Sequence, residues 1–541
     1  MQRREFLLGA SMAALLNACG QPAGFSSKPP LPPGTLTEPA RLLGHRLRQK
    51  DFPAPTETRR VAVVIAGGGI GGLSASWRLQ HAGCDDFLLL EMESSVGGNS
   101  RAGSNAVAPY PLGAHYLPLP PPEARAVRRL LRELNVLKPD GQYDEAYLCH
   151  APQERLYRDG YWHDGLLPSL GLGASERAEH ARFHDQIAEL RSTRDHAGRR
   201  PFALPMALSS REAAWRATDR SNFRDWLLQN GYTSPALHWL ADYACRDDYG
   251  TRAAETSAWA GLHYFSCREG EGQVLTTPGG NAWLTDGLKQ GLKQGMEGTR
   301  SAQLQADAVL WRVTETRHQV ACDVYLAAEN RSIRILAREL IWAAPLFLIP
   351  HVFVPPRPEW LAALAGIEYA PWVVVNLTLS APPETRAGVP LAWDNVLYDS
   401  PALGYVVATH QQLRYAPAPT VITWYRALHE ESVRSPATPL LQMDRAAWAE
   451  AALRDLERAH PEIRQTATRI DVHRHAHAMI RPRPGSLWDG RREVFTRNHG
   501  RVRFAHADVS GFSLFEEANH RGVLAAERTL TRLGVSFNTF L

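Results

Sequence analysis

Lysine is scarce in this chain of 541 residues and occurs only at positions 28, 50, 138, 289 and 293. Arginine carries nearly all of the positive charge, and the net charge of +4 is small for this length. Basic and aromatic residues do not gather into runs of the kind that binds nucleic acid. The sequence therefore argues against a nucleic-acid partner.

Cysteine pairs and long hydrophobic runs are also missing. The six cysteines show no Cys-x-x-Cys spacing, which argues against both a metal site and a disulfide framework. No apolar run is long enough to span a bilayer as a permanent helix. With 44% hydrophobic and 21% charged residues, the composition is that of an ordinary globular protein, and the length predicts two domains.

The first residues resemble an export signal. Arg3 and Arg4 precede a short apolar run, as in twin-arginine signals. The run ends at Cys19 in Leu-Asn-Ala-Cys, which resembles a lipobox whose cysteine is lipidated. We therefore expect residues 1–19 to be a signal, and the protein to be exported to the periplasm with a lipid anchor at Cys19 as its membrane contact. A basic, disordered cytoplasmic tail is the alternative.

Residues 61–91 carry the clearest fold signal. The continuous apolar run 61–66 predicts a strand that is buried on both faces. Residues 73–82 predict a helix, with Gly83 placed to end it. Residues 87–91 predict a second buried strand that ends in a carboxylate. This strand, helix and strand indicate a Rossmann-like α/β fold.

A glycine-rich turn joins the first strand to the helix. Its glycines satisfy Gly-x-Gly-x-x-Gly, with Gly71 inside the same turn. Gly67 permits the tight turn, Gly69 lets the backbone approach a pyrophosphate, and Gly72 permits close packing of helix and strand. Glu91 lies 91 − 72 = 19 residues beyond Gly72, where a carboxylate can bind a ribose. Together these features predict a dinucleotide site rather than a merely structural turn.

The segment after Glu91 resembles the flavin amine oxidase superfamily, which includes monoamine and polyamine oxidases, protoporphyrinogen oxidase and phytoene desaturases. The resemblance rests on a Gly97-Gly98 pair that follows the strand-ending acid. Relatives usually have Gly-Gly-Arg, whose arginine touches the FAD phosphates. Here Asn99 holds that place, and the nearest arginine is Arg101.

Three further segments extend the resemblance. Residues 111–116 resemble the loop beside the flavin ring, residues 308–311 resemble the strand that meets the adenine, and residues 503–533 resemble the closing FAD motif and its helix. The resemblance implies FAD as cofactor, held by Gly67, Gly69, Gly71, Gly72, Glu91, Gly98, Arg101, Gly113, Ala114, Val309, Asp508 and Gly511.

The family resemblance also implies an architecture of interleaved segments. A Rossmann-like FAD-binding domain is expected from residues 59–116, 268–345 and 498–541. An α+β substrate domain is expected from residues 117–267 and 346–497.

Local patterns predict the other elements. Proline-rich residues 20–58 predict an extended tether with a short helix near residues 42–48. The remaining expectations are helices at 123–134, 176–190, 222–230, 282–290 and 515–533, a hairpin near 156–162, and strands at 372–379 and 421–426.

Two polar stretches are harder to interpret. Residues 243–250 are dense in polar and aromatic side chains, and a solvated loop is favoured over a substrate-facing role. His473, His475 and His477 alternate, so they share one face of a strand. A plain polar face is favoured there over a metal site, and no metal is expected.

His115 and Tyr116 are the catalytic candidates, because they follow the pair expected beside the flavin. Histidine can move a proton near neutral pH, although a packing role without proton transfer is the alternative. Many amine oxidases of this family place a lysine from the second substrate segment near the flavin, but residues 346–541 contain none. Either a water is held by another group, or the substrate is not an amine. Trp424, Tyr425 and Arg481 are weaker candidates for cavity walls.

These observations favour an FAD-dependent oxidoreductase of the amine oxidase type. It would transfer a hydride from a small organic substrate to FAD and pass electrons to oxygen or an envelope carrier. A phytoene-type desaturase or isomerase acting on an apolar substrate is one alternative. A non-catalytic binding or escort module is the other, and the intact phosphate motif argues against it.

Overall fold

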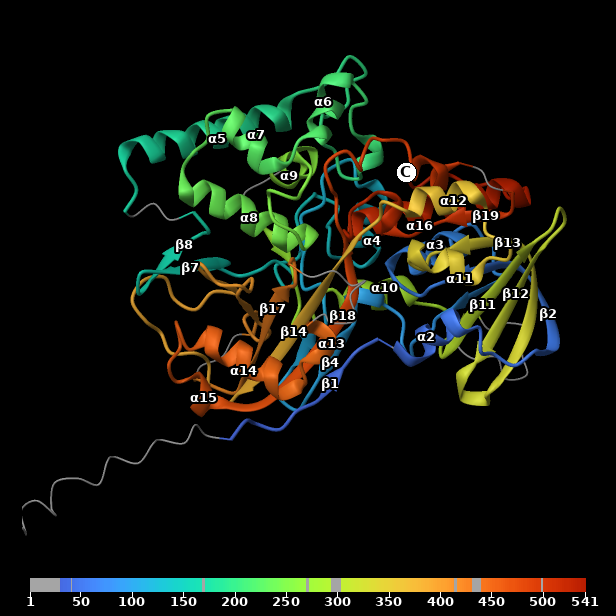
Figure 1. Ribbon diagram of the computed structural model, residues 1–541, viewed down its shortest axis with the longest axis horizontal. Coiled ribbons are helices and arrows are strands. Elements are labelled where there is room, and N and C mark those ends of the chain that lie inside the picture. Colours follow the sequence, from blue (N-terminus) through green and yellow to red (C-terminus); the bar gives the residue numbers. More distant parts are fainter. Residues whose placement is uncertain are drawn as a thin grey trace, which may run out of the picture.

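The computed structural model describes residues 30–39, 41–167, 171–268, 272–292, 303–412, 416–430, 439–497 and 500–541. The signal expected at residues 1–19 lies outside this part of the chain. Two sheets of different topology dominate the fold, and helices cover each of them (Figure 1).

The first sheet is the Rossmann-like one. Its order is β10-β3-β2-β13-β12-β11, with β19 beside β13, and the pairs among β10, β3, β2, β13 and β19 are parallel. Its strands are β2 (Pro55–Ala66), β3 (Phe87–Leu90), β10 (Leu304–Gln305), β11 (Ala308–Glu315), β12 (Val320–Leu326), β13 (Arg331–Trp342) and β19 (Val502–Phe504).

Both faces of β2 are buried over its last four residues, 63–66, which belong to the continuous apolar run. Val63 and Ile65 pack into one core with α3 (Ile70–Gln80) and α16 (Phe515–Leu533). Val64 packs into a second core with residues of α11 (Ile349–Val352) and α12 (Pro358–Leu364). Alternate side chains of one strand therefore serve two cores, which requires a run without polar interruptions.

The second sheet draws strands from distant parts of the chain. Its order is β1-β18-β14-β17-β16-β15-β7-β8. The strands are β1 (Leu36–Thr37), β7 (Glu154–Arg158), β8 (Tyr161–Asp164), β14 (Tyr369–Leu379), β15 (Asp394–Leu397), β16 (Tyr405–Val407), β17 (Thr420–Ala427) and β18 (Ala467–Ile480). The predicted hairpin is confirmed as β7 and β8, and Asp159 and Gly160 of its turn both have positive φ.

A group of helices lies beside the second sheet (Figure 1). It contains α5 (Ala174–Ser192), α6 (Ala213–Ala217), α7 (Phe223–Gln229), α8 (Pro235–Tyr249) and α9 (Ala258–Ser266). Helices α5 and α7 confirm two predictions, and α4 (Arg125–Glu133), α10 (Ala282–Lys289) and α16 confirm three more. The other elements are α2 (Arg41–Gln49), α13 (Pro439–Gln442), α14 (Arg445–Leu456), α15 (Ile463–Thr466), β4 (Ala102–Ser104), β5 (Pro109–Pro111), β6 (Leu117–Pro118) and β9 (Val274–Leu275).

The prediction of a solvated loop at residues 243–250 is wrong. This stretch forms the last turns of α8, which end at Gly250 with φ +61. Its polar side chains are largely buried, so no alternation of polar and apolar residues marks the helix.

The prediction of a plain polar face for the histidines of β18 is also wrong. His473 and His475 are buried, because β1 pairs with the edge of β18 beside them and the loop around Leu112 accepts a hydrogen bond from His475. No group of three or more metal-ligating side chains is found in the described residues.

The segment expected as a tether contains regular structure. β1 pairs with β18, and α2 confirms the short helix expected near residues 42–48. Strand β2 starts at Pro55, six residues before the apolar run begins at Val61.

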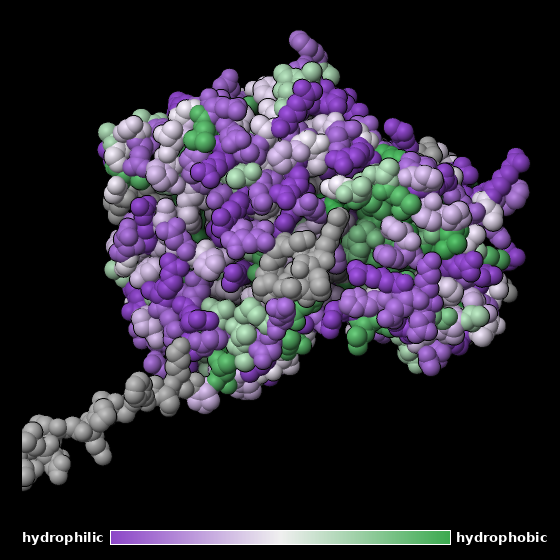
Figure 2. Space-filling view, in the orientation of Figure 1, coloured by the Kyte–Doolittle hydropathy of each residue, from purple (hydrophilic) through white to green (hydrophobic). Residues whose placement is uncertain are grey.

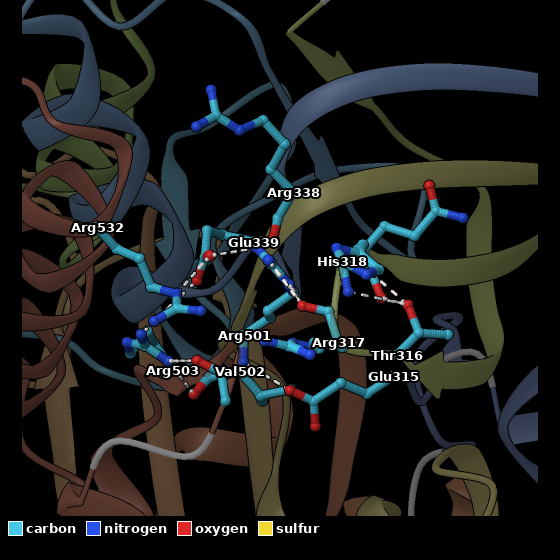
Figure 3. A network of polar contacts seen from close by, with 12 residues as sticks. Glu315, Thr316, Arg317, His318, Arg338, Glu339, Arg501, Val502, Arg503 and Arg532 are labelled. Carbon is cyan, nitrogen blue, oxygen red and sulfur yellow. Dashed lines mark hydrogen bonds and ion pairs between the residues drawn. The ribbon is translucent and has the colours of Figure 1, made fainter.

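The buried carboxylate of Glu339 joins strand β13 to strand β19 and helix α16 (Figure 3). Glu339 of β13 is 1% exposed, and its Oε1 lies 2.8 Å from Nε of Arg532 on α16 and 3.1 Å from Nη1 of Arg501. Arg503 of β19 places Nη2 3.7 Å from the other oxygen of Glu339. The cluster fixes the end of α16 against the sheet.

Hydrophilic side chains cover most of the face shown in Figure 2, with hydrophobic ones in smaller areas among them. Among the described residues, no helix has both the length and the apolar character needed to cross a membrane.

Candidate functional site

The glycine-rich turn lies between β2 and α3, and each glycine has its own steric reason. Gly67 has φ +105, and a Cβ there would stand 2.9 Å from the backbone of Ala343. A Cβ on Gly72 would overlap the carbonyl oxygen of Gly67. By contrast, no described residue lies within 4 Å of the Cβ position of Gly69, at the N-terminus of α3. The space in front of Gly69 is therefore where a pyrophosphate fits.

Gly71 serves packing within the protein. A Cβ on Gly71 would overlap the carbonyl oxygen of Ala505, just after β19. One on Gly522 of α16 would overlap the carbonyl oxygen of Gly71. These glycines let α3, α16 and the end of β19 approach closely.

Glu91 closes the same turn. Its Oε2 accepts a hydrogen bond of 2.7 Å from the Gly68 amide, and its Oε1 accepts one of 2.8 Å from the Glu93 amide. Burial raises the pKa of the Glu91 carboxyl. The Ala308 amide donates to the Glu91 carbonyl at 2.8 Å, which brings Val309 to this end of the sheet. The acid and the strand expected beside a ribose and an adenine therefore lie together.

A second loop meets the glycine-rich turn. The Gly97 amide donates to the Gly68 carbonyl at 2.8 Å, and a Cβ on Gly98 would stand 3.3 Å from Cα of Gly69. Arg101 donates to the Gly98 carbonyl at 3.2 Å and pairs with Glu93 at 3.3 Å. The structure thus brings Gly98 and Arg101 to the edge of the phosphate space.

Asn99, which replaces the usual arginine, joins two loops to β18. Its side-chain amide donates to the Ala478 carbonyl at 2.8 Å. Its carbonyl accepts the Ala114 amide at 2.8 Å, and a Cβ on Gly113 would stand 2.5 Å from that oxygen. Gly113 is therefore required for the contact between the second loop and the expected flavin loop.

Asp508 has an unused acceptor. It is buried, and its Oδ2 accepts from the Tyr369 hydroxyl at 2.6 Å and the Leu346 amide at 3.0 Å. Its Oδ1 has no hydrogen-bond partner among the described residues. Gly511, with φ +83, ends the turn that carries Asp508. A buried carboxylate oxygen without a partner suits a ligand hydroxyl, such as one on a ribityl chain.

These features fit FAD. Glu91 would hold the ribose, the Gly69 turn the pyrophosphate, and Asp508 the ribityl chain.

His115 and Tyr116 follow the flavin loop. The His115 ring stacks on Tyr425 with centroids 4.3 Å apart, and Trp393 lies 5.7 Å from the same ring. Burial lowers the pKa of His115 to about 4. The imidazole is therefore neutral near pH 7 and forms part of an aromatic wall.

The match to one protein family covers most of the chain and so decides the family to which it belongs. The family of flavin containing amine oxidoreductases matches residues 70–530. The chain belongs to this family. Membership implies a flavin enzyme with FAD as its cofactor, which agrees with the geometry above.

Individual relatives are more distant. The oxidoreductase PigB of Serratia sp. is 30% identical over 416 residues, which cover 69% of this chain and 59% of that protein. Hydroxyneurosporene desaturase of Cereibacter sphaeroides is 28% identical over 222 residues, which cover 37% of this chain and 42% of that protein. The matches thus span about half the length of these curated relatives.

The fold agrees with that of solved amine oxidases. A redesigned putrescine oxidase superposes with a TM-score of 0.66 at 15% identity, covering 88% of this chain and 100% of the other. The expected α/β architecture of the flavin amine oxidoreductases is therefore confirmed.

A cluster of acidic and aromatic side chains, here called the acidic–aromatic cluster, lies beside His115 in this flavin amine oxidoreductase. The His115 ring lies 4.8 Å from the Tyr116 ring, and the Tyr116 hydroxyl donates to Asp247. The cluster consists of His115, Tyr116, Glu154, Asp247, Tyr264 and Asp394.

Three of these side chains are carboxylic acids. Glu154 of β7 and Asp394 of β15 lie directly opposite each other in a parallel strand pair. Burial and then the charge of Asp164 raise the pKa of Glu154 to about 7. Burial and then the charge of Glu154 raise the pKa of Asp394 well above its usual range. Burial is also the main cause that raises the pKa of Asp247, on α8.

The acids outnumber the cation that faces them. Arg268 lies 3.7 Å from Asp248 and 3.8 Å from Glu516, so it is shared between two carboxylates. Among the described residues, neither Glu154 nor Asp394 has an arginine at ion-pair distance. The acidic–aromatic cluster therefore holds more carboxyl groups than cations.

Sequence reasoning found part of this site. Asp247 lies in the polar stretch for which a substrate-facing role was one alternative, and Tyr425 was a weak candidate for a cavity wall. Trp424 points into the core and donates to Asp455 at 2.9 Å, while Arg481 donates to the Leu428 carbonyl at 3.3 Å. Glu154 and Asp394 were missed, because no local motif marks them.

Proposed function

We propose that this protein is an FAD-dependent oxidoreductase that oxidises an amine. The observation that carries the proposal is the acidic–aromatic cluster beside His115, which contains the three acids Glu154, Asp247 and Asp394. A protonated amine would pair with the ionised acids, and the ring of Tyr116 would add cation–π attraction.

The residues of the acidic–aromatic cluster have different roles in this chemistry. FAD, when bound, accepts a hydride from the carbon next to the nitrogen. An amine gives up that hydride only as the free base, so the ammonium must first lose a proton. Glu154, with a pKa near 7, is matched to accept a proton at neutral pH. The neutral rings of His115 and Tyr425 orient the substrate without repelling its charge.

An apolar substrate is the less favoured candidate, although one relative is a hydroxyneurosporene desaturase. A polyene would offer these three carboxylic acids neither a charge nor a hydrogen bond. Each polar group that loses its solvation without gaining a partner costs about 1–3 kcal/mol.

Anaerobic reduction of the purified protein tests the function. An aliphatic amine, the alcohol of the same carbon skeleton and a polyene are each mixed with the yellow protein. We expect the amine alone to bleach the flavin, and oxygen or an added quinone or haem carrier to restore its colour. Bleaching by the polyene but not by the amine would support the desaturase instead, and colourless protein would contradict FAD binding.

We also propose that the protein is exported by the twin-arginine route and anchored through Cys19. The support is the sequence pattern at residues 3–19 together with the need to bind FAD in the cytoplasm. An FAD site of this kind exists only in the folded chain, and the twin-arginine route transports folded proteins.

A further inference from the structure

The segment of residues 30–54, here called the strap, lies outside the family match and runs between the two sheets (Figure 1). Its first part, β1, pairs with β18 at the edge of the second sheet. Its second part, α2, buries Leu47 in a core of the first sheet and packs against α11. The strap therefore contacts both halves of the protein. Residue 40, within it, is not among the described residues.

Specific side chains fix the strap to β18. The Thr37 hydroxyl lies 2.7 Å from Nδ1 of His473, and Glu38 pairs with Arg474 at 2.7 Å. The Thr35 hydroxyl donates to Asp471 at 2.8 Å. Gly34 lies so close to the sheet that a Cβ there would overlap the Ile470 carbonyl oxygen.

The same strand holds the loops of the cofactor site. The His473 ring lies 4.4 Å from the His475 ring, whose Nε2–H donates to the Leu112 carbonyl at 2.8 Å. Leu112 precedes the Gly113-Ala114 pair of the flavin loop. Further along β18, the Ala478 carbonyl accepts from Asn99 at 2.8 Å. A chain of contacts therefore leads from Thr37 to the flavin loop.

The helix of the strap is close to the other end of the site. His477 of β18 stacks on Phe347 at 4.2 Å and meets the Tyr369 ring at 5.6 Å. The Tyr369 hydroxyl donates to Asp508. Arg48 of α2 lies near enough for its charge to act on His477.

We propose that the strap positions the flavin loop through Thr37, His473 and His475, and thereby slows the release of FAD. These three are positioning residues, because they act through the loop and not on the substrate. The proposal rests on the FAD binding proposed above and goes beyond it by assigning a cofactor-retaining role to the N-terminal segment.

The test uses holoprotein variants and measures the rate of FAD release by the recovery of flavin fluorescence after dilution. Thr37→Val keeps the shape but removes the hydroxyl, and Thr37→Ser restores it. We expect Thr37→Val to release FAD about fivefold faster, the factor that corresponds to one lost hydrogen bond. Thr37→Ser is expected near the wild-type rate, together with a normal flavin absorption spectrum.

A glycine pair supplies a matched control within the strap. Gly34→Ala forces β1 away from β18, whereas nothing lies within 4 Å of the Cβ position of Gly44 in α2. We expect faster FAD release from Gly34→Ala and none of this effect from Gly44→Ala. Hydrogen exchange of residues 30–38 reports directly whether the strap is displaced.

The outcomes separate this proposal from the proposed function. Wild-type protein that purifies without flavin contradicts FAD binding itself. If wild type binds FAD and Thr37→Val releases it at the wild-type rate, the strap proposal is overturned. It is equally overturned if Gly34→Ala shows increased exchange at residues 30–38 with unchanged FAD release.

Discussion

The Tyr116 hydroxyl donates a hydrogen bond of 3.0 Å to Oδ2 of Asp247, across 131 residues of sequence. Tyr116 directly follows the flavin loop, and Asp247 lies on α8 of the helical group. The bond brings a carboxylate of this group to the residues expected beside the flavin. Under the proposed function, the charge of the substrate and the flavin chemistry would meet at this contact.

Glu154→Gln is expected to change how stability depends on pH. The pKa of Glu154 is raised from 4.5 to about 7, so the protonated acid stabilises the fold at low pH. That stability is lost as pH rises through about 7, by up to about 3 kcal/mol. Relative to wild type, Glu154→Gln should therefore gain unfolding free energy between pH 5 and pH 8. Urea unfolding of the ligand-free protein at each pH measures this free energy. The exposed Glu145→Gln is the control. If unfolding free energy depends on pH in the same way in all three proteins, the raised pKa of Glu154 is contradicted.

Gly69→Ala should yield folded protein without flavin. The Cβ meets no protein atom within 4 Å, but it would occupy the space in which the pyrophosphate fits. The flavin-to-protein absorbance ratio and the circular dichroism spectrum measure cofactor and fold separately. Gly173→Ala is the control, because Gly173 also precedes a helix but lies outside the site. Full flavin content in Gly69→Ala would refute the assignment of this turn.

His115→Ala should retain flavin and slow its anaerobic reduction by substrate by about tenfold or more, because the substrate loses an orienting ring. His115→Phe keeps the stacking surface against Tyr425 and is expected to recover part of the rate. Stopped-flow absorbance measures both. Reduction at the wild-type rate in His115→Ala would show that the residue is remote from the chemistry.

Glu339→Gln should destabilise the protein by about 2–3 kcal/mol, because it leaves the buried Arg503 without its counter-ion. Arg532 is 43% exposed and water can solvate it, so Arg532→Gln should cost less than about 1 kcal/mol. Chemical denaturation at neutral pH compares the two variants. Equal losses of unfolding free energy in the two variants would mean that the exposed Arg532 contributes most of the stability and the buried Arg503 little.

Replacing both Arg3 and Arg4 by lysine is expected to trap a folded, yellow precursor in the cytoplasm. Cys19→Ala is expected to act later, giving exported protein without lipid. Cell fractionation with an absorption spectrum of each fraction tests both steps. Normal export of the double-lysine variant would exclude the twin-arginine route.

The sequence alone predicted the elements whose signals are local. The run 61–66, the glycine turn and Glu91 are close together, and each depends on chain geometry within one strand–helix–strand unit. The last helix was expected at residues 515–533, and α16 has these bounds. Short-range periodicity sufficed there, because one face of the helix packs on α3.

Only the tertiary structure decided what surrounds His115. Glu154 and Asp394 become neighbours because β7 and β15 pair in parallel, a contact between strands 240 residues apart. Asn99 and the histidines of β18 acquire partners through the same long-range packing. Buried polar residues carry no periodic signal, since their burial is compensated by hydrogen bonds to distant segments. The sequence determined the cofactor motif, and long-range strand pairing decided which acids and rings lie beside His115.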